Sequence, residues 1–60
     1  MPSNVAPGAQ LYDKALIPFG GGDGHSIAWT HDGKTILVGM VRGTKAKVEA
    51  AAKAVNAKLG

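Results

Sequence analysis

Two short runs of alternating apolar and polar residues flank the pair Asp32-Gly33 in the second half of the chain. An Asp-Gly pair between such runs is the strongest short-range signal for a β-hairpin, because a type I′ turn needs positive φ at both central residues. With these two residues as the loop, the pairing begins with His31 opposite Lys34. The pattern predicts a hairpin over residues 25–42.

The two faces of this predicted hairpin differ in size and polarity. Strand side chains alternate between faces, so one face collects the larger apolar residues and should be the core side. That face carries Ile27, Trp29, Ile36, Val38 and Met40. The opposite face is smaller and more mixed, and its Leu37 and Val41 lack an obvious cover. We therefore predict a protein interface at these two residues.

A helical pattern follows the hairpin directly and predicts a helix over residues 44–59. Thr44 is a suitable N-cap, and Gly60 stands where helices commonly end. The apolar stripe at helical spacing consists of Val48, Ala51, Ala52, Val55 and Leu59. A polar ridge consists of Lys45, Glu49, Lys53 and Asn56. Three alanines, Ala50, Ala54 and Ala57, point away from the predicted core and form a second predicted protein interface.

The first third of the chain has weaker patterns. Residues 1–8 contain two prolines and no periodicity, which predicts an extended arm held by a partner or a neighbouring subunit. Residues 10–17 alternate loosely and predict a strand, although a short helix over residues 9–16 also fits the spacing. Residues 20–24 are four glycines and an aspartate, which predict a flexible loop.

Together these patterns predict an α+β fold: a small antiparallel sheet of two or three strands with one C-terminal helix packed on one face. We expect an N-terminal arm (1–8) and a single small domain (9–60). A chain of sixty residues buries only about 60% of its unfolded surface, so its core is marginal without help. The sequence has no cysteine, which excludes disulfides and thiolate metal sites. A protein partner or a homo-oligomer is the remaining source of stability.

The net charge of +3 is mild, but its distribution is uneven. Five of the seven basic residues lie in the last nineteen positions. This permits contact with nucleic acid or an acidic surface without requiring either. No run approaches membrane-spanning length, and the N-terminus lacks the charged and apolar regions of a signal peptide. We expect no membrane contact and a cytoplasmic or virion location.

No metal, cofactor or catalytic site is predicted. His25 and His31 share a strand face but are separated by roughly 20 Å at about 3.3 Å per residue, which is too far for one ion. Asp32 is needed for the turn, and Asp23 lies in the predicted loop. The glycine run leads into a strand without a following lysine, unlike a phosphate-binding loop.

The best signal for ligand binding is the basic corner, which comprises Arg42, Thr44, Lys45 and Lys47. Helix N-termini carry partial positive charge and unpaired N–H groups, so acidic residues are normally favoured there. This helix begins with two lysines instead and has no acid before Glu49. Such a corner suits a phosphate or a partner's carboxylate, whereas the ordinary alternative is a solvated lysine-rich surface.

The C-terminal half resembles parts of several known families. Residues 35–42 with the alanine-rich helix that follows resemble the last strand and helix of arm-type integrase and plant ethylene-response DNA-binding domains. They are similar as well to half of a peptidoglycan-binding SPOR domain. Residues 24–26 (Gly-His-Ser) before a hairpin resemble the short histidine motif of mRNA-cleaving toxins with a double-stranded-RNA-binding-like fold. Each resemblance covers only part of the chain, so no family is assigned.

The function predicted first is a non-enzymatic structural or assembly subunit of a larger complex or virion. It would bind protein partners through its arm, its exposed sheet face and its helix. The alternative is a nucleic-acid-binding module that contacts phosphates through Arg42, Lys45 and Lys47. A small ribonuclease or another enzyme ranks third.

Overall fold

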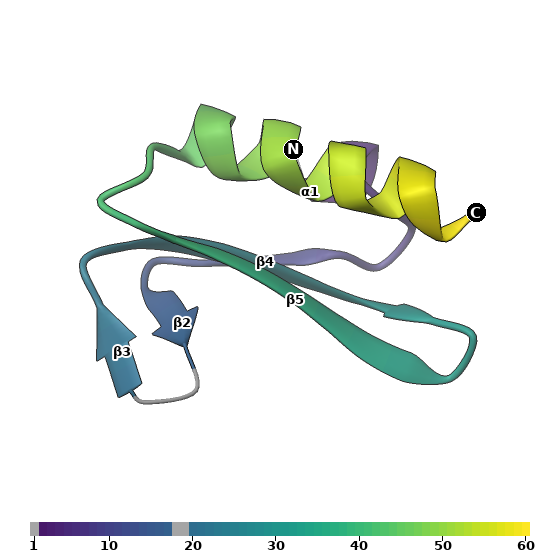
Figure 1. Ribbon diagram of the computed structural model, residues 1–60, viewed down its shortest axis with the longest axis horizontal. Helices are drawn as coiled ribbons and strands as arrows, with labels where there is room; N and C mark the ends of the chain where they lie inside the picture. The colour runs from purple at the N-terminus through teal and green to yellow at the C-terminus, as the bar shows by residue number, and fades with distance from the viewer. Residues whose placement is uncertain (1, 18–19) are drawn as a thin grey trace.

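The computed structural model describes residues 2–17 and 20–60, and it places one α-helix over a three-stranded antiparallel sheet (Figure 1). A two-stranded hairpin lies on the other side of the sheet (Figure 1). The predicted α+β class is confirmed. The elements are a 3₁₀ turn η1 (Pro2–Asn4), β1 (Gln10–Tyr12), β2 (Ala15–Ile17), β3 (Gly20–Gly22), β4 (Gly24–His31), β5 (Lys34–Val41) and α1 (Lys45–Leu59). The larger sheet has the order β1-β4-β5, and β2 pairs with β3.

The central hairpin has the predicted register. Asp32 and Gly33 have φ values of 51° and 76°, as a type I′ turn requires. His31 pairs with Lys34, and the pairing continues without a slip to Gly24 opposite Val41. The turn chemistry therefore determines which side chains share a face along the whole of β4 and β5.

The helix also begins where the sequence predicts. Thr44 is the N-cap, and its hydroxyl oxygen accepts a hydrogen bond of 3.2 Å from the Lys47 N–H. Val48 and Ala52 are buried, which confirms the centre of the predicted stripe. Leu59 is 39% exposed, so its assignment to the buried stripe is wrong.

The face of the sheet that packs against α1 is here called the helix face, and the opposite one the lower face. The predicted core residues are on the helix face, where Ile27 and Trp29 are buried. The half-buried residues that pack around them are Ala9, Leu11, Ile36, Val38, Met40 and Val55. Small residues on the helix allow this close approach, because Val48 and Ala52 occupy little space between helix and sheet.

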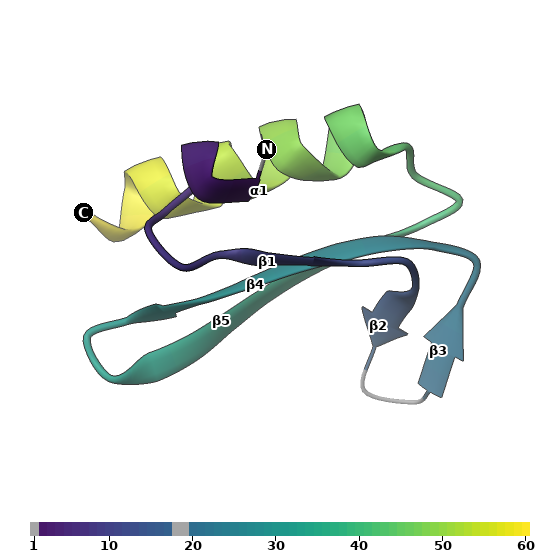
Figure 2. The ribbon, with the colours of Figure 1, turned by 180° about the vertical axis from the view of Figure 1, so that it is seen from behind.

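The N-terminal segment is not the predicted extended arm. Of residues 1–8, positions 2–8 are described, and they fold back beside α1 (Figure 2). Val5 and Ala6 are buried in the same core as Trp29. Asn56, predicted on a polar ridge, donates a hydrogen bond of 2.8 Å to the Val5 carbonyl. Because only two residues enter the core, the segment shows no periodicity in the sequence.

The predicted single strand over residues 10–17 is wrong. The chain bends at Asp13 and Lys14 and divides into β1 on the edge of the main sheet and β2 beneath it. The predicted loop over residues 20–24 is wrong as well, since Gly20–Gly22 forms β3 and pairs with β2. We call these two strands the β2–β3 hairpin. It covers one part of the lower face (Figure 1).

Candidate functional site

The lower face carries the accessible apolar residues of the sheet. It is divided by two hydrogen bonds that Ser26 makes with Lys14 and Leu16, which we call the polar clasp. Ser26 is fully buried there; its hydroxyl donates to the Lys14 carbonyl (2.7 Å) and accepts from the Leu16 N–H (2.8 Å). A Cβ atom at Gly39 would lie 2.9 Å from the Leu16 carbonyl oxygen, so this position needs glycine. β2 therefore crosses directly beneath β4 and β5 at Ser26 and Gly39.

The remainder of the lower face is open. Leu37 is 45% exposed and Val41 is 57% exposed, and they lie on β5 on either side of Gly39. Both predicted interface residues on the sheet are thus accessible. Tyr12 on β1 is exposed on the same face, and its hydroxyl donates to Gln10 Oε1 (3.1 Å). Sequence reasoning missed Tyr12, although pairing of Leu11 with Ile27 on the helix face would have placed it here.

A shallow hollow lies beside these residues. Its volume is about 230 Å³. The residues around it are Gly8, Gln10, Tyr12, Ala28, Trp29, Thr30 and Thr35. The side chains of lower-face positions here are short or polar, so the hollow favours an extended polypeptide over a large apolar ligand.

The backbone of β5 is unpaired along one side. The Arg42 N–H donates to the Asp23 carbonyl (2.7 Å), which extends the ladder whose first pair is His31 and Lys34. In an antiparallel ladder, alternate residues direct both backbone groups to the same neighbour. The outward residues of β5 are therefore Thr35, Leu37, Gly39 and Val41. Within the described chain, β4 is the only strand paired with β5, so these groups face outward from the sheet edge.

The second predicted interface lies elsewhere. Ala50, Ala54 and Ala57 are exposed on the side of α1 that faces away from the sheet. Since α1 covers the helix face, the structure does not bring these alanines together with Leu37 and Val41. A hollow of about 230 Å³ lies beside Ala46, Glu49, Ala50 and Lys53 on this helix.

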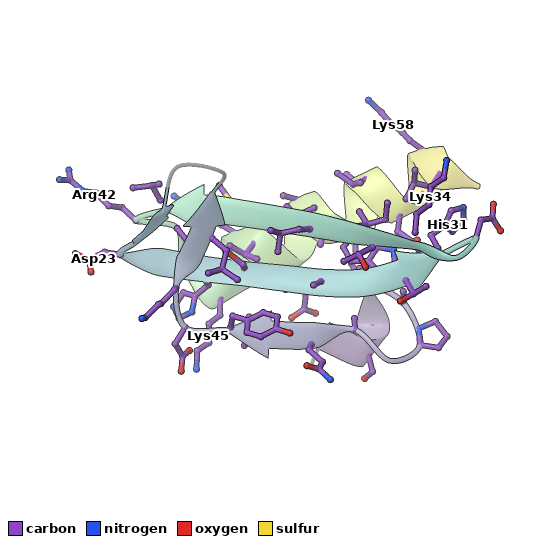
Figure 3. The ribbon with its side chains drawn as sticks, turned by 90° about the horizontal axis from the view of Figure 1, so that it is seen from below. Asp23, His31, Lys34, Arg42, Lys45 and Lys58 are labelled. Atoms are coloured by element: carbon purple, nitrogen blue, oxygen red, sulfur yellow. The ribbon has the colours of Figure 1, made fainter. Side chains whose placement is uncertain are left out.

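The cations of the basic corner do not converge. Arg42 has a left-handed backbone conformation (φ 59°) and extends past the end of β5, whereas Lys45 lies toward the β1 edge (Figure 3). Thr44 already occupies the Lys47 N–H, and its carbonyl accepts from the Val48 N–H (3.0 Å). Arg42, Lys45 and Lys47 are all exposed, and the first turn of α1 contains no acid. The arrangement is an open cationic surface.

The histidines are far apart, each beside one aspartate. His25 Nδ1 lies 3.3 Å from Asp13 Oδ1, and His31 Nε2 lies 3.5 Å from Asp32 Oδ2. Sequence reasoning missed Asp13, which approaches His25 only because the chain bends between β1 and β2. Within residues 2–17 and 20–60, no group of three or more potential metal-ligating side chains comes together.

Comparisons with protein-family models, curated proteins and solved structures gave no match. The partial resemblances of the C-terminal half therefore gain no support. Among the described residues, no helix has the length and apolar character needed to cross a membrane.

Proposed function

We propose that the chain is a non-enzymatic assembly subunit that binds a protein partner through the lower face of its sheet. The observation that carries this proposal is the exposure of Leu37 (45%) and Val41 (57%) on a strand with an unpaired edge. Exposed apolar residues beside free backbone groups are typical of strands that bind another chain. The N-terminal segment plays no part in this proposal, because Val5 and Ala6 belong to the core.

The lower face suits this function better than the helix does. Interfaces are richest in aromatic and larger apolar side chains, and Tyr12, Leu37 and Val41 are of that kind. The exposed alanines of α1 have little side-chain surface to bury, and alanine is common in helices for its propensity alone. A subunit of this kind would reside in the cytoplasm or in a virion.

The proposal can be tested in the native source with two matched double variants. Leu37→Lys/Val41→Lys places charges on the lower face, and Ala54→Lys/Ala57→Lys places the same charges on α1. We expect the tagged wild type and the α1 variant to elute in a complex larger than the 6.1 kDa chain. The lower-face variant should elute alone while keeping the wild-type thermal melt. A wild-type chain that elutes alone, or equal behaviour of the two variants, would contradict the proposal.

A nucleic-acid-binding module is the second candidate. It is favoured by the absence of acids from the first turn of α1, where Lys45 and Lys47 are exposed. Each phosphate contact contributes about 0.9 to the slope of log K against log salt for duplex DNA. Lys45→Glu/Lys47→Glu should therefore weaken DNA or RNA binding and flatten its salt dependence, whereas Lys53→Glu/Lys58→Glu should change it less. Equal effects of the two pairs would show that any binding depends on net charge alone.

A further inference from the structure

We propose that the partner of the β5 edge is a second copy of this chain, paired antiparallel with β5 about a two-fold axis at Leu37. The pairing would join two three-stranded sheets into one continuous sheet. This inference rests on the proposed function and specifies the occupant of the lower-face edge.

The first argument is that β5 can pair with itself without placing any side chain on the wrong face. A two-fold axis perpendicular to the sheet keeps the helix face of both copies on the same side. The outward backbone groups belong to the odd-numbered residues Thr35, Leu37, Gly39 and Val41. They form hydrogen bonds only in registers that set an odd-numbered residue of one copy opposite an odd-numbered residue of the other. The axis must therefore pass through Leu37, Val38 or Gly39 for most of these groups to find partners.

The second argument is charge, which disfavours the register centred on Val38. That register would use every outward residue, but it sets Lys34 opposite Arg42 of the second copy at both ends. Like charges directly opposite one another destabilise a strand pair. Lys34 begins β5 and Arg42 directly follows the strand, and the repulsion between these cations acts against this fully paired arrangement.

The third argument is the position of the β2–β3 hairpin, which distinguishes Leu37 from Gly39. Figure 3 shows the lower face, where the hairpin crosses beneath β5, and the contact of Leu16 with the Gly39 position marks the crossing. An axis at Gly39 would bring the two β2 strands to the same level. An axis at Leu37 separates them by four residues, about 13 Å at 3.3 Å per residue, which is well above the ~4.8 Å between neighbouring strands of one layer.

The Leu37 register also matches the exposed side chains. On the lower face, Leu37 meets Leu37 of the second copy, and Thr35 meets Gly39. On the helix face, the half-buried Ile36 lies opposite Val38, so the two cores become continuous along the new strand pair. Lys34 lies opposite Met40 rather than opposite a cation. An interface of this kind is small, so the dimer should be weak and depend on concentration.

The absence of native cysteine allows a direct test with two single-cysteine variants. Cα atoms of a hydrogen-bonded pair lie about 5.5 Å apart, within the range that a disulfide spans. We expect Leu37→Cys to form a disulfide-linked dimer under mild oxidation. Val41→Cys, at an even more exposed position, should remain monomeric because the two Val41 positions lie about 26 Å apart. Equal cross-linking of both variants would overturn the proposal, as would a preferred mixed disulfide between them.

Sedimentation of the unmodified chain over a wide concentration range gives the second readout. We expect reversible dimerisation for the wild type and for Val41→Lys, and its loss for Leu37→Lys, with similar thermal melts for all three at low concentration. A wild type that stays monomeric would overturn the self-pairing. If the lower-face variant nevertheless loses its complex in the native source, the proposed function stands and the edge binds a different chain.

Discussion

The two faces of the sheet are closed in different ways. The helix face is closed by apolar side chains from α1, β1 and the N-terminal segment, which surround Ile27 and Trp29. Among the described residues, the lower face is closed where β2 crosses it, through the polar clasp of Ser26 with Lys14 and Leu16, whereas Leu37 and Val41 on either side are exposed. The free energy gained by burying apolar area is roughly proportional to that area and depends little on exact atomic positions. The clasp, in contrast, depends on the positions of a few hydrogen-bonding atoms. The helix face should therefore carry most of the stability and the lower face most of the capacity to bind.

Removing the largest side chain of the helix face should have the greatest effect. Trp29 is only 3% exposed, so Trp29→Ala should lower the free energy of unfolding by about 3–5 kcal/mol. Leu37→Ala on the lower face should cost far less, because Leu37 is exposed in the monomer. Urea unfolding followed by circular dichroism measures both. Similar midpoints for the two variants would show that the faces are closed equally well.

Breaking the clasp should have a smaller and more local effect. Ser26→Ala removes the donor to Lys14 and the acceptor for Leu16, which should cost about 1–3 kcal/mol. The β2–β3 hairpin should detach while β4, β5 and α1 remain paired. Two-dimensional NMR would record shifts confined to the hairpin and to the lower face around Gly39. Loss of dispersion throughout the spectrum would mean instead that the clasp supports the whole fold.

The polar contact on the helix side should matter less than the clasp. Asn56→Ala removes the hydrogen bond to the Val5 carbonyl and should cost about 1 kcal/mol. Val5 and Ala6 should remain seated, because their apolar contacts do not depend on Asn56. Thermal melting gives the stability, and limited proteolysis reports on the N-terminal segment. Rapid cleavage near Val5 would show that the amide, rather than the apolar contact, holds this segment.

The smallest expected change concerns the start of α1. Lys45→Glu/Lys47→Glu places acids where the helix dipole favours them, so each should raise the stability by about 0.3–1 kcal/mol at low salt. The gain should decline as salt is added, since exposed charges are screened. Melting temperatures at two ionic strengths measure it. A fall in stability would show that the lysines make favourable contacts of their own.

The parts of the fold that the sequence predicts are those determined by local chemistry. Asp32-Gly33 sets the register of β4 and β5, and Thr44 sets the start of α1. The β2–β3 hairpin could not be predicted in this way. Ser26 contacts residues ten and twelve positions away, and nothing in the local pattern around Lys14 or Leu16 indicates a bend under the sheet.

The candidate surfaces divide in the same manner. Exposure of Leu37 and Val41 follows from strand alternation once the core face is known. The separation of Arg42 from Lys45 could not be predicted from their spacing in the sequence, because the left-handed conformation of Arg42 turns the chain between strand and helix. Neighbouring positions in the sequence can therefore carry cations to different sides of the molecule, and only the backbone path shows it.

The clasp has a consequence for the local opening motions of this chain. The Leu16 N–H is bonded to a side-chain hydroxyl rather than to a backbone carbonyl of the main sheet. Its deuterium exchange should therefore follow detachment of the hairpin, while amides within β4 exchange only when the central ladder opens. The exchange rate of the Leu16 amide proton can thus report the detachment of the hairpin from the lower face separately from the unfolding of the molecule.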